Sequence, residues 1–338
     1  MTLAAPKQIR EFQAVDRRRF EDEIRIACRP AVLRGLVADW PAVAAARRSD
    51  EDLIAYLKRF RHDRPVPVIV GNPEIEGRFF YTDDLKGMNF GQGTSRLDPF
   101  LDRLIRDRFN QRPYTIALQS LPIPDLVPGF DVENATGLLD ATVVPRMWMG
   151  NAARVAPHYD LMENIGCVVA GRRRFTLFPP DQISNLYVGP LELTPAGTPV
   201  SLVDLAAPDF ERFPRFAEAL ATAEVAELGP GDAIFIPYHW WHAVDSLEPI
   251  NLFINYWWND APAQTESPYD AMMHAFLAIK GLPPAQRAVW RHVFNHYVFE
   301  RNGDPAAHLP NHAQGALGPL DETQRDRLRV TLKRVFGA

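Results

Sequence analysis

The chain has 338 residues, of which 46% are hydrophobic and 23% are charged, and its formal net charge is −5. This is the composition of a globular protein with room for a large core, and the negative charge argues against a dedicated nucleic-acid binder. The chain has only two cysteines, so we expect no disulfide framework. It shows no apolar leader and no run of about 18 apolar residues, which predicts a cytoplasmic protein without a membrane partner.

The first third of the chain mixes helix and strand patterns. An apolar stripe predicts a helix over residues 16–28, and a strand is expected over residues 29–36. Ser49 begins a capping-box pattern for a helix that ends at Phe60, and residues 65–70 are typical of a strand. Asp98 is expected to cap a helix through Phe109. Residues 1–113 are therefore predicted to form an α/β extension that packs on the segment after it.

From Tyr114 onward the pattern changes to short apolar runs separated by proline, glycine and aspartate. The expected strands are Tyr114–Gln119, Val143–Met149, Ile165–Ala170, Arg174–Phe178, Val200–Val203, Ala233–Pro237, His242–Leu247 and Asn251–Trp257. Many short strands without helices between them predict a mainly β fold, a double-stranded β-helix or jelly roll, over residues 114–260.

Helical patterns return after Asp260 and predict a C-terminal helical tail over residues 261–338. The expected helices are Pro268–Ile279, Pro284–Phe299 and Leu320–Phe336.

The most informative motif is His158-Tyr159-Asp160, together with the distant His242. Alternate residues of an extended segment share a face, so His158 and Asp160 can point at one metal while Tyr159 points away. Two histidines and one carboxylate form the facial triad of non-haem Fe(II) oxygenases. A lone His-x-Asp is weak evidence, but His242 follows an apolar strand and a turn, as expected for a site at a barrel mouth.

His239 also lies near His242, and the pair resembles a metal-binding His-x-x-His. Residues three apart on a strand face opposite ways, so both histidines cannot bind one ion without a turn. We therefore expect His242 to be the ligand and His239 to lie outside the metal site.

Several ordered blocks between Arg29 and Trp258 resemble the JmjC-type, cupin-like Fe(II) and 2-oxoglutarate dioxygenases, in particular an asparaginyl hydroxylase of that family. The blocks are Arg29–Gly35, Asp39–Pro41, His158–Asp160 with Asn164, Phe175–Pro180, Pro208–Pro214, Gly229–His242 and Asn255–Trp257. The resemblance implies an Fe(II) site at His158, Asp160 and His242, with 2-oxoglutarate as co-substrate.

The resemblance also implies a cation that neutralises the distal carboxylate of 2-oxoglutarate. Arg173 stands where the family hydroxylase has a lysine, and its forked guanidinium can hold a carboxylate through two hydrogen bonds. The alternative is that Arg173 belongs to a solvated strand edge. Asn164 and Asn255 match positions that flank the co-substrate, although structural amide bonding in the barrel wall is about equally consistent with them.

Two positions depart from the family hydroxylase. Val155 stands where that enzyme has a threonine, and Ala117 stands where it has a tyrosine, so two hydroxyls that assist co-substrate binding are missing. Tyr114, Tyr159 or Tyr256 could replace them. These departures weaken the prediction of 2-oxoglutarate more than that of iron.

The leading hypothesis is an oxygenase that hydroxylates a C–H bond, with a protein or peptide substrate favoured over a metabolite. Trp257 is the first candidate substrate contact and Tyr159 the second, although aromatic side chains in a β-core are usually structural. The alternatives are the same chemistry on a small metabolite, and a cupin-like metal-binding or sensing module without turnover. Lysine demethylation is disfavoured because no zinc cluster or chromatin-reader segment accompanies the domain.

The helix expected over residues 284–299 carries a broad apolar surface that includes Trp290, Val293, Phe294 and Val298. Packing within the chain is one explanation. The other is a two-fold homodimer through these helices, which the resemblance also implies.

Overall fold

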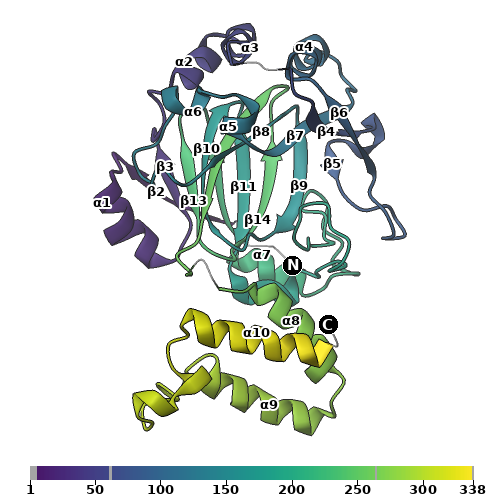
Figure 1. Cartoon of the computed structure of the whole chain (residues 1–338). Coiled ribbons are helices and arrows are strands. Elements are labelled where there is room, and N and C mark those ends of the chain that lie inside the picture. Colours follow the sequence, from purple (N-terminus) through teal and green to yellow (C-terminus); the bar gives the residue numbers. More distant parts are fainter. Residues whose placement is uncertain (1–5, 61–62, 263–264, 337–338) are drawn as a thin grey trace. The chain divides into compact units, whose positions relative to one another are not determined.

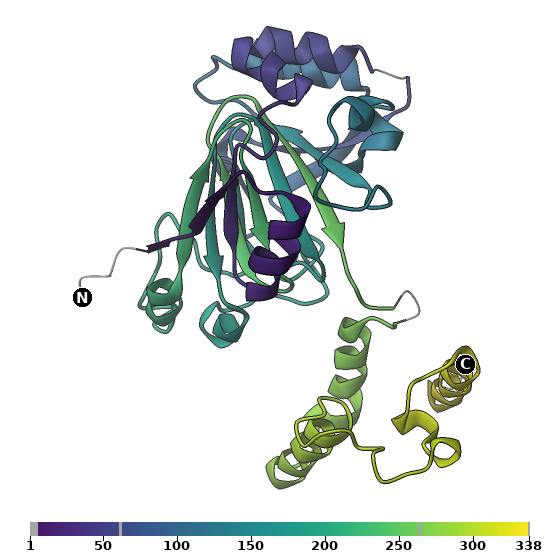
Figure 2. The same cartoon turned by 90° about the vertical axis from the view of Figure 1, so that its left-hand side faces the viewer.

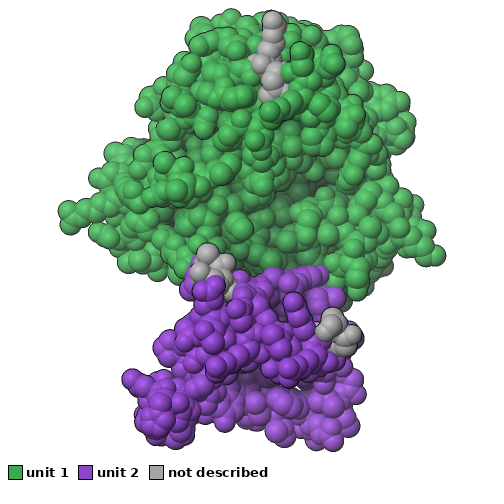
Figure 3. All heavy atoms as spheres, in the orientation of Figure 1, with its two compact units in different colours: residues 1–260 green, residues 261–338 purple. Residues whose placement is uncertain are grey.

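The computed structural model describes residues 6–60, 63–262 and 265–336. The chain divides into two compact units, Met1–Asp260 and Ala261–Ala338, which Figure 3 draws in green and purple. The first unit contains both β-sheets and the second is helical.

The two sheets of the first unit have six and nine strands, and they confirm the predicted mainly β jelly-roll fold. In spatial order, the six-stranded sheet consists of β1 (Lys7–Gln8), β12 (Glu224–Leu228), β11 (Arg173–Phe178), β14 (Trp241–Ser246), β9 (Ala153–His158) and β5 (Arg78–Phe79). The nine-stranded sheet consists of β2 (Arg10–Gln13), β3 (Ala31–Arg34), β13 (Ala233–Ile236), β10 (Glu163–Ala170), β15 (Asn251–Trp258), β8 (Pro145–Gly150), β7 (Thr115–Pro122), β4 (Val66–Gly71) and β6 (Phe90–Ser95).

Strand alternation separates the side chains of the sheets into an inner and an outer set. On β10, Val168 belongs to an apolar cluster that joins both sheets, whereas its neighbour Cys167 belongs to a cluster on the outer face of the larger sheet. On β11, Phe175 and Leu177 belong to the inner set, and the intervening Thr176 does not. The space between the sheets therefore receives every second side chain of the central strands.

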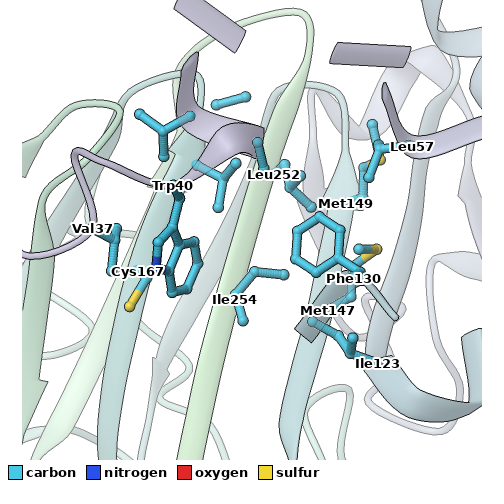
Figure 4. Close-up of a cluster of buried hydrophobic side chains, with 14 of the residues drawn as sticks. Val37, Trp40, Leu57, Ile123, Phe130, Met147, Met149, Cys167, Leu252 and Ile254 are labelled. Atoms are coloured by element: carbon cyan, nitrogen blue, oxygen red, sulfur yellow. The ribbon is translucent and has the colours of Figure 1, made fainter. Parts of the chain in front are cut away.

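Short helices cover the outer face of the nine-stranded sheet at one end of the first unit (Figures 1 and 2). They are α2 (Pro41–Arg48), α3 (Asp50–Lys58), α4 (Leu97–Asp107), α5 (Ile123–Leu126) and α6 (Phe130–Glu133). Figure 4 shows Trp40, Phe130 and other side chains from this end against Cys167 and Ile254 of the sheet. The N-terminal segment also supplies strands to both sheets, so its core is continuous with theirs.

Side chains cap two of the helices in the N-terminal segment. Asp16 accepts a hydrogen bond from the backbone N–H of Arg19 and caps α1 (Arg17–Arg19), which continues as a π-turn and a 3₁₀ turn to Ala27. Ser49 caps α3 as predicted. The prediction for Asp98 was wrong, because α4 begins at Leu97 and Asp98 lies in its first turn, where its charge favours the helix dipole.

One predicted strand is absent and several observed strands were missed. The segment 200–203 is a loop with a single bridge at Ser201, whose hydroxyl bonds the Leu186 carbonyl and whose N–H bonds Pro157. The missed strands are β1, β2, β5, β6, β9 and β12. They are short, glycine-rich or interrupted by proline, so they carry little apolar alternation. The helix α7 (Phe216–Thr222) follows this loop region and packs on Phe178 and Trp241.

The second unit consists of α8 (Pro268–Ala275), which continues as a π-turn to Lys280, α9 (Pro284–Tyr297) and α10 (Glu322–Phe336). No residue of α8 or α9 is buried, and Pro305 and Ala306 are the only buried residues among those described in this unit. A segment of this size that buries so little apolar surface lacks a stabilising core. We therefore propose that a second copy of the chain covers these helices. No described helix has the length and apolar character needed to cross a membrane.

The dimer proposal predicts that Trp290→Arg combined with Phe294→Arg gives a folded monomer, because these side chains contact each other on α9 and charges would repel the second copy. Light scattering gives the mass and a thermal melt reports folding. A wild-type mass of one chain at micromolar concentration would exclude the dimer, and aggregation of the variant would assign the face to intramolecular packing.

Candidate metal centre

A cavity of about 380 Å³ lies between the two sheets of the first unit. Its lining residues are Phe79, Gln119, Ser120, Trp148, Val155, Ala156, His158, Asp160, Asn164, Arg173, Phe175, Pro195, Ala196, Gly197, Val200, Ile236, His242, Val244, Phe253, Asn255 and Trp257. All three predicted metal ligands and all three predicted co-substrate contacts are in this set.

The ligand histidines lie side by side because β9 and β14 pair in a register that sets His158 opposite His242. This register shifts between His242 and Val244, which is the mark of a β-bulge. The bulge lets Val155 and His158, which a regular strand would send to opposite faces, both line the cavity. An irregularity near Pro157 thus aims the first ligand inward.

Asp160 completes the cluster two residues after the end of β9. The candidate ligand atoms of His158, Asp160 and His242 all lie within 4.8 Å of one another. The Nε2 atom of His242 is 3.6 Å from Oδ2 of Asp160, and the two imidazole centroids are 4.2 Å apart. These separations suit three ligands on one face of an ion.

Backbone carbonyls select the imidazole tautomers. Nδ1 of His158 is 2.9 Å from the Ala156 carbonyl oxygen, and Nδ1 of His242 is 3.0 Å from that of Trp240. A carbonyl oxygen can only accept, so each Nδ1 carries the hydrogen and each Nε2 keeps its lone pair. The pKa of His158 is lowered to about 4, mainly by burial and secondly by the neighbouring His242. Both features favour a neutral His158 ring, and the hydrogen bond to Trp240 leaves Nε2 of His242 facing the cluster with its lone pair.

A chain of hydrogen bonds orients the carboxylate ligand. The Trp148 indole donates to Oδ1 of Asn255 at 2.7 Å, and Nδ2 of Asn255 donates to Oδ1 of Asn164 at 3.2 Å. Nδ2 of Asn164 donates to Oδ2 of Asp160 at 3.3 Å. Trp257 donates its indole N–H to the same oxygen at 3.0 Å. Asp160 is therefore held by two donors, and Asn164, Asn255 and Trp257 all support it.

Arg173 is a buried cation on the same cavity wall. The residue is 8% exposed, its Nε has no hydrogen-bond partner among the described residues, and its guanidinium carbon lies 4.7 Å from the centre of the Phe253 ring. Burial alone lowers the pKa of Arg173 to about 9, so the group is still charged at neutral pH. This location excludes the alternative of a solvated strand edge.

The structure does not support Tyr159 as a substrate contact. Its ring is buried away from the cavity, stacked on His239 at 4.0 Å and packed edge-on against Trp241 at 4.7 Å. Strand alternation explains the error, since a residue between two inward ligands points outward. His239 has a left-handed backbone with φ of 62° and lies outside the ligand cluster.

The missing hydroxyls are not replaced by the tyrosines considered above. Tyr256 belongs to the outer core cluster, Tyr114 is exposed, and no described residue of the cavity lining is a tyrosine or threonine. Val155 lines the cavity where the family hydroxylase has its threonine, so this part of the wall is apolar.

Sequence reasoning missed three polar lining residues, Trp148, Gln119 and Ser120. Trp148 lies between Met147 and Met149, both of which face the outer core, and this alternation was available in the sequence. Gln119 and Ser120 lie in a register shift of β7, where Ser120 has a left-handed backbone with φ of 53°. Arg146 donates to the Ser120 carbonyl oxygen at 2.9 Å and fixes this bulge. No pattern in the sequence predicts this bulge.

The pattern of the cupin-like domain family matches residues 17–264. Lysine-specific demethylase JMJ31 of Arabidopsis thaliana is 28% identical over 267 residues, which cover 71% of this chain and 47% of that protein. Lysine-specific demethylase 8 of Xenopus tropicalis is 26% identical over 245 residues, covering 71% of this chain and 50% of that protein. Jumonji C domain-containing protein 5 of Drosophila melanogaster is 28% identical over 256 residues, which cover 74% of this chain and 59% of that protein. The chain thus spans about half the length of the curated relatives it matches.

The ligand geometry predicts that His158→Ala or His242→Ala abolishes stoichiometric Mn(II) binding, because each removes one of three converging atoms. His239→Ala serves as the control and should bind normally. Calorimetry or electron paramagnetic resonance measures the stoichiometry. Full occupancy in the His242 variant would contradict the assignment.

The hydrogen-bond chain predicts that Trp257→Phe weakens Mn(II) affinity by about tenfold, since Asp160 loses one of its orienting donors. Trp258→Phe is the matched control, because Trp258 packs on Phe20 and Phe235 instead. Both affinities are measured by titration. Equal affinities for the two variants would show that the indole N–H does not support the ligand.

Proposed function

The chain belongs to the cupin-like domain family, and on this premise we propose that it is an Fe(II)- and 2-oxoglutarate-dependent oxygenase that hydroxylates a C–H bond of a protein side chain. His158, Asp160 and His242 would hold the metal. Two neutral imidazoles and one carboxylate, converging from one side, fit Fe(II) and leave other positions for ligands from solution.

With 2-oxoglutarate and O₂, bound Fe(II) supplies the oxidising power for hydroxylation of an unactivated C–H bond. The protein's own contribution is positional. Backbone carbonyls fix the two imidazole tautomers, and the Trp148–Asn255–Asn164 chain with Trp257 fixes the carboxylate. Apolar side chains of Phe175, Ile236 and Phe253 exclude water from the walls.

The observation that carries the co-substrate assignment is the buried Arg173. A buried cation without a carboxylate partner is disfavoured by on the order of several kcal/mol. A dicarboxylate that enters the cavity would supply the missing charge and acceptors for the unsatisfied Nε. The apolar wall at Val155 removes one hydroxyl that the family uses, so Arg173 would bear more of the binding.

Electrostatics favours hydroxylation of an uncharged side chain over removal of a methyl group from lysine. Asp160 is the only carboxylate among the described residues that line the cavity, and it is assigned to the metal. A methylated ammonium group entering this space would have no acidic partner and would lose its hydration. Demethylation, which the sequence alone disfavours, becomes a second candidate because two of the relatives described above are named lysine-specific demethylases.

Two further alternatives have distinct signatures. A small metabolite as substrate would give turnover without any peptide, and a metal-binding sensor would bind Fe(II) without consuming 2-oxoglutarate. A protein substrate and a cytoplasmic location stay predictions. Mass spectrometry of a peptide library after incubation separates hydroxylation, a gain of one oxygen, from loss of a methyl group.

The assignment predicts that Arg173→Gln weakens 2-oxoglutarate binding by about tenfold or more, because it removes a charge-assisted hydrogen-bond pair. Anaerobic titration of the Fe(II) protein with 2-oxoglutarate, read from the metal-to-ligand charge-transfer band, measures the affinity. Metal binding should be retained. Arg172→Gln is the control, since Arg172 lies beside it but is paired with Glu227 and Glu248 on the exterior.

Unchanged affinity in the Arg173 variant would place the carboxylate anchor elsewhere. A wild-type protein that binds Fe(II) but shows no charge-transfer band with 2-oxoglutarate would reject the oxygenase proposal and favour the sensor.

A further inference from the structure

The outer face of the six-stranded sheet carries a row of charged side chains behind the main cavity. The strand registers set Arg78 beside Arg154, Arg154 beside Asp245, and Asp245 beside Arg174. Their sequence neighbours Phe79, Val155, Val244 and Phe175 line the main cavity. Because side chains alternate along a strand, the charged row lies on the opposite side of the sheet.

A second cavity of about 210 Å³ lies over this row and beneath the segment 203–206. Its lining includes three arginines, Arg78, Arg154 and Arg174, but two carboxylates, Asp204 and Asp245. Arg174 is 56% exposed and also reaches Glu227 on the next strand, whereas Arg78 and Arg154 are largely covered.

Among the described residues, the guanidinium groups of Arg78 and Arg154 form ion pairs with Asp204 but donate no side-chain hydrogen bond. Like charges directly opposite each other destabilise a sheet, so this pair needs a counter-charge. Asp204 is 3.4 Å from the Arg78 guanidinium and 3.8 Å from that of Arg154, beyond the usual length of a charge-assisted hydrogen bond. One of its oxygens already accepts from the Ala206 N–H. Nη2 of Arg78 is buried without any partner in the described part of the chain.

We propose that this second cavity is a binding site for a small oxyanion, a phosphate or a carboxylate, held between the guanidinium groups of Arg78 and Arg154. Two neighbouring guanidinium forks offer paired N–H donors in the geometry that such oxygens accept. The ligand would accept a hydrogen bond from Nη2 of Arg78 and add negative charge beside the two neighbouring guanidinium groups. The site is separate from the metal centre and does not depend on the proposed function.

The test is calorimetric titration of the metal-free protein with inorganic phosphate at constant ionic strength. Arg78→Gln and Arg154→Gln should each weaken binding by about tenfold. Asp204→Asn should strengthen it several-fold, because the competing carboxylate becomes a neutral amide of the same shape. Arg173→Gln removes any phosphate that binds in the main cavity, and the binding that depends on Arg78 and Arg154 should persist in this variant. Arg172→Gln, an exterior arginine variant, should bind as the wild type does.

The sign of the Asp204→Asn effect is decisive. If the arginines serve only to hold Asp204, this variant melts at a lower temperature and gains no affinity for phosphate, which would overturn the proposal. Loss of binding in Arg173→Gln would also overturn it. N-acetylaspartate amide is titrated in parallel as a carboxylate probe. Tighter binding of phosphate identifies a free phosphate, and tighter binding of the aspartate probe identifies an acidic peptide side chain. No heat from either probe refutes the site.

Discussion

The two-residue periodicity of strands that face each other across a narrow space is the constraint on which this structure depends. It assigns Val168 to the interior and Cys167 to the helical side of the same strand, and it does so on every central strand. The candidate metal centre includes places where this periodicity is broken. A bulge in β9 turns His158 inward beside Val155, and a second bulge in β7 brings both Gln119 and Ser120 to the cavity.

The main cavity contains two charged groups of opposite sign that do not pair with each other. One carboxylate, Asp160, and one guanidinium, Arg173, face the same cavity without forming an ion pair with each other. Asp160 accepts hydrogen bonds from Asn164 and Trp257, whereas burial acts against the charge on Arg173. A metal cation and a dicarboxylate would complement these two groups separately, which is why the cofactor and co-substrate assignments support each other.

Sequence reasoning reached the fold and the ligand set because both are encoded in short periodic patterns. The strands that are nearly continuous apolar runs, such as Ala233–Ile236 and Asn251–Trp258, were located to within a residue or two. The edge strands were not, since Phe90–Ser95 is mostly glycine and polar residues. The role of Asn164 and Asn255 as supports of Asp160 depends on pairing between β10 and β15, a long-range register that no local pattern reports. Tyr159 was misjudged because proximity in sequence to two ligands is not proximity in space.

The hydrogen-bond chain that ends on Asp160 has a direction. It begins at an indole that can only donate and ends at a carboxylate that accepts, so the amides of Asn255 and Asn164 between them each have one permitted orientation. If any single member is changed, a neighbouring donor or acceptor in the chain loses its partner. In evolution these residues should therefore behave as one inherited unit: Trp148, Asn255 and Asn164 should persist together in lineages that keep the carboxylate and drift together in lineages that abandon it.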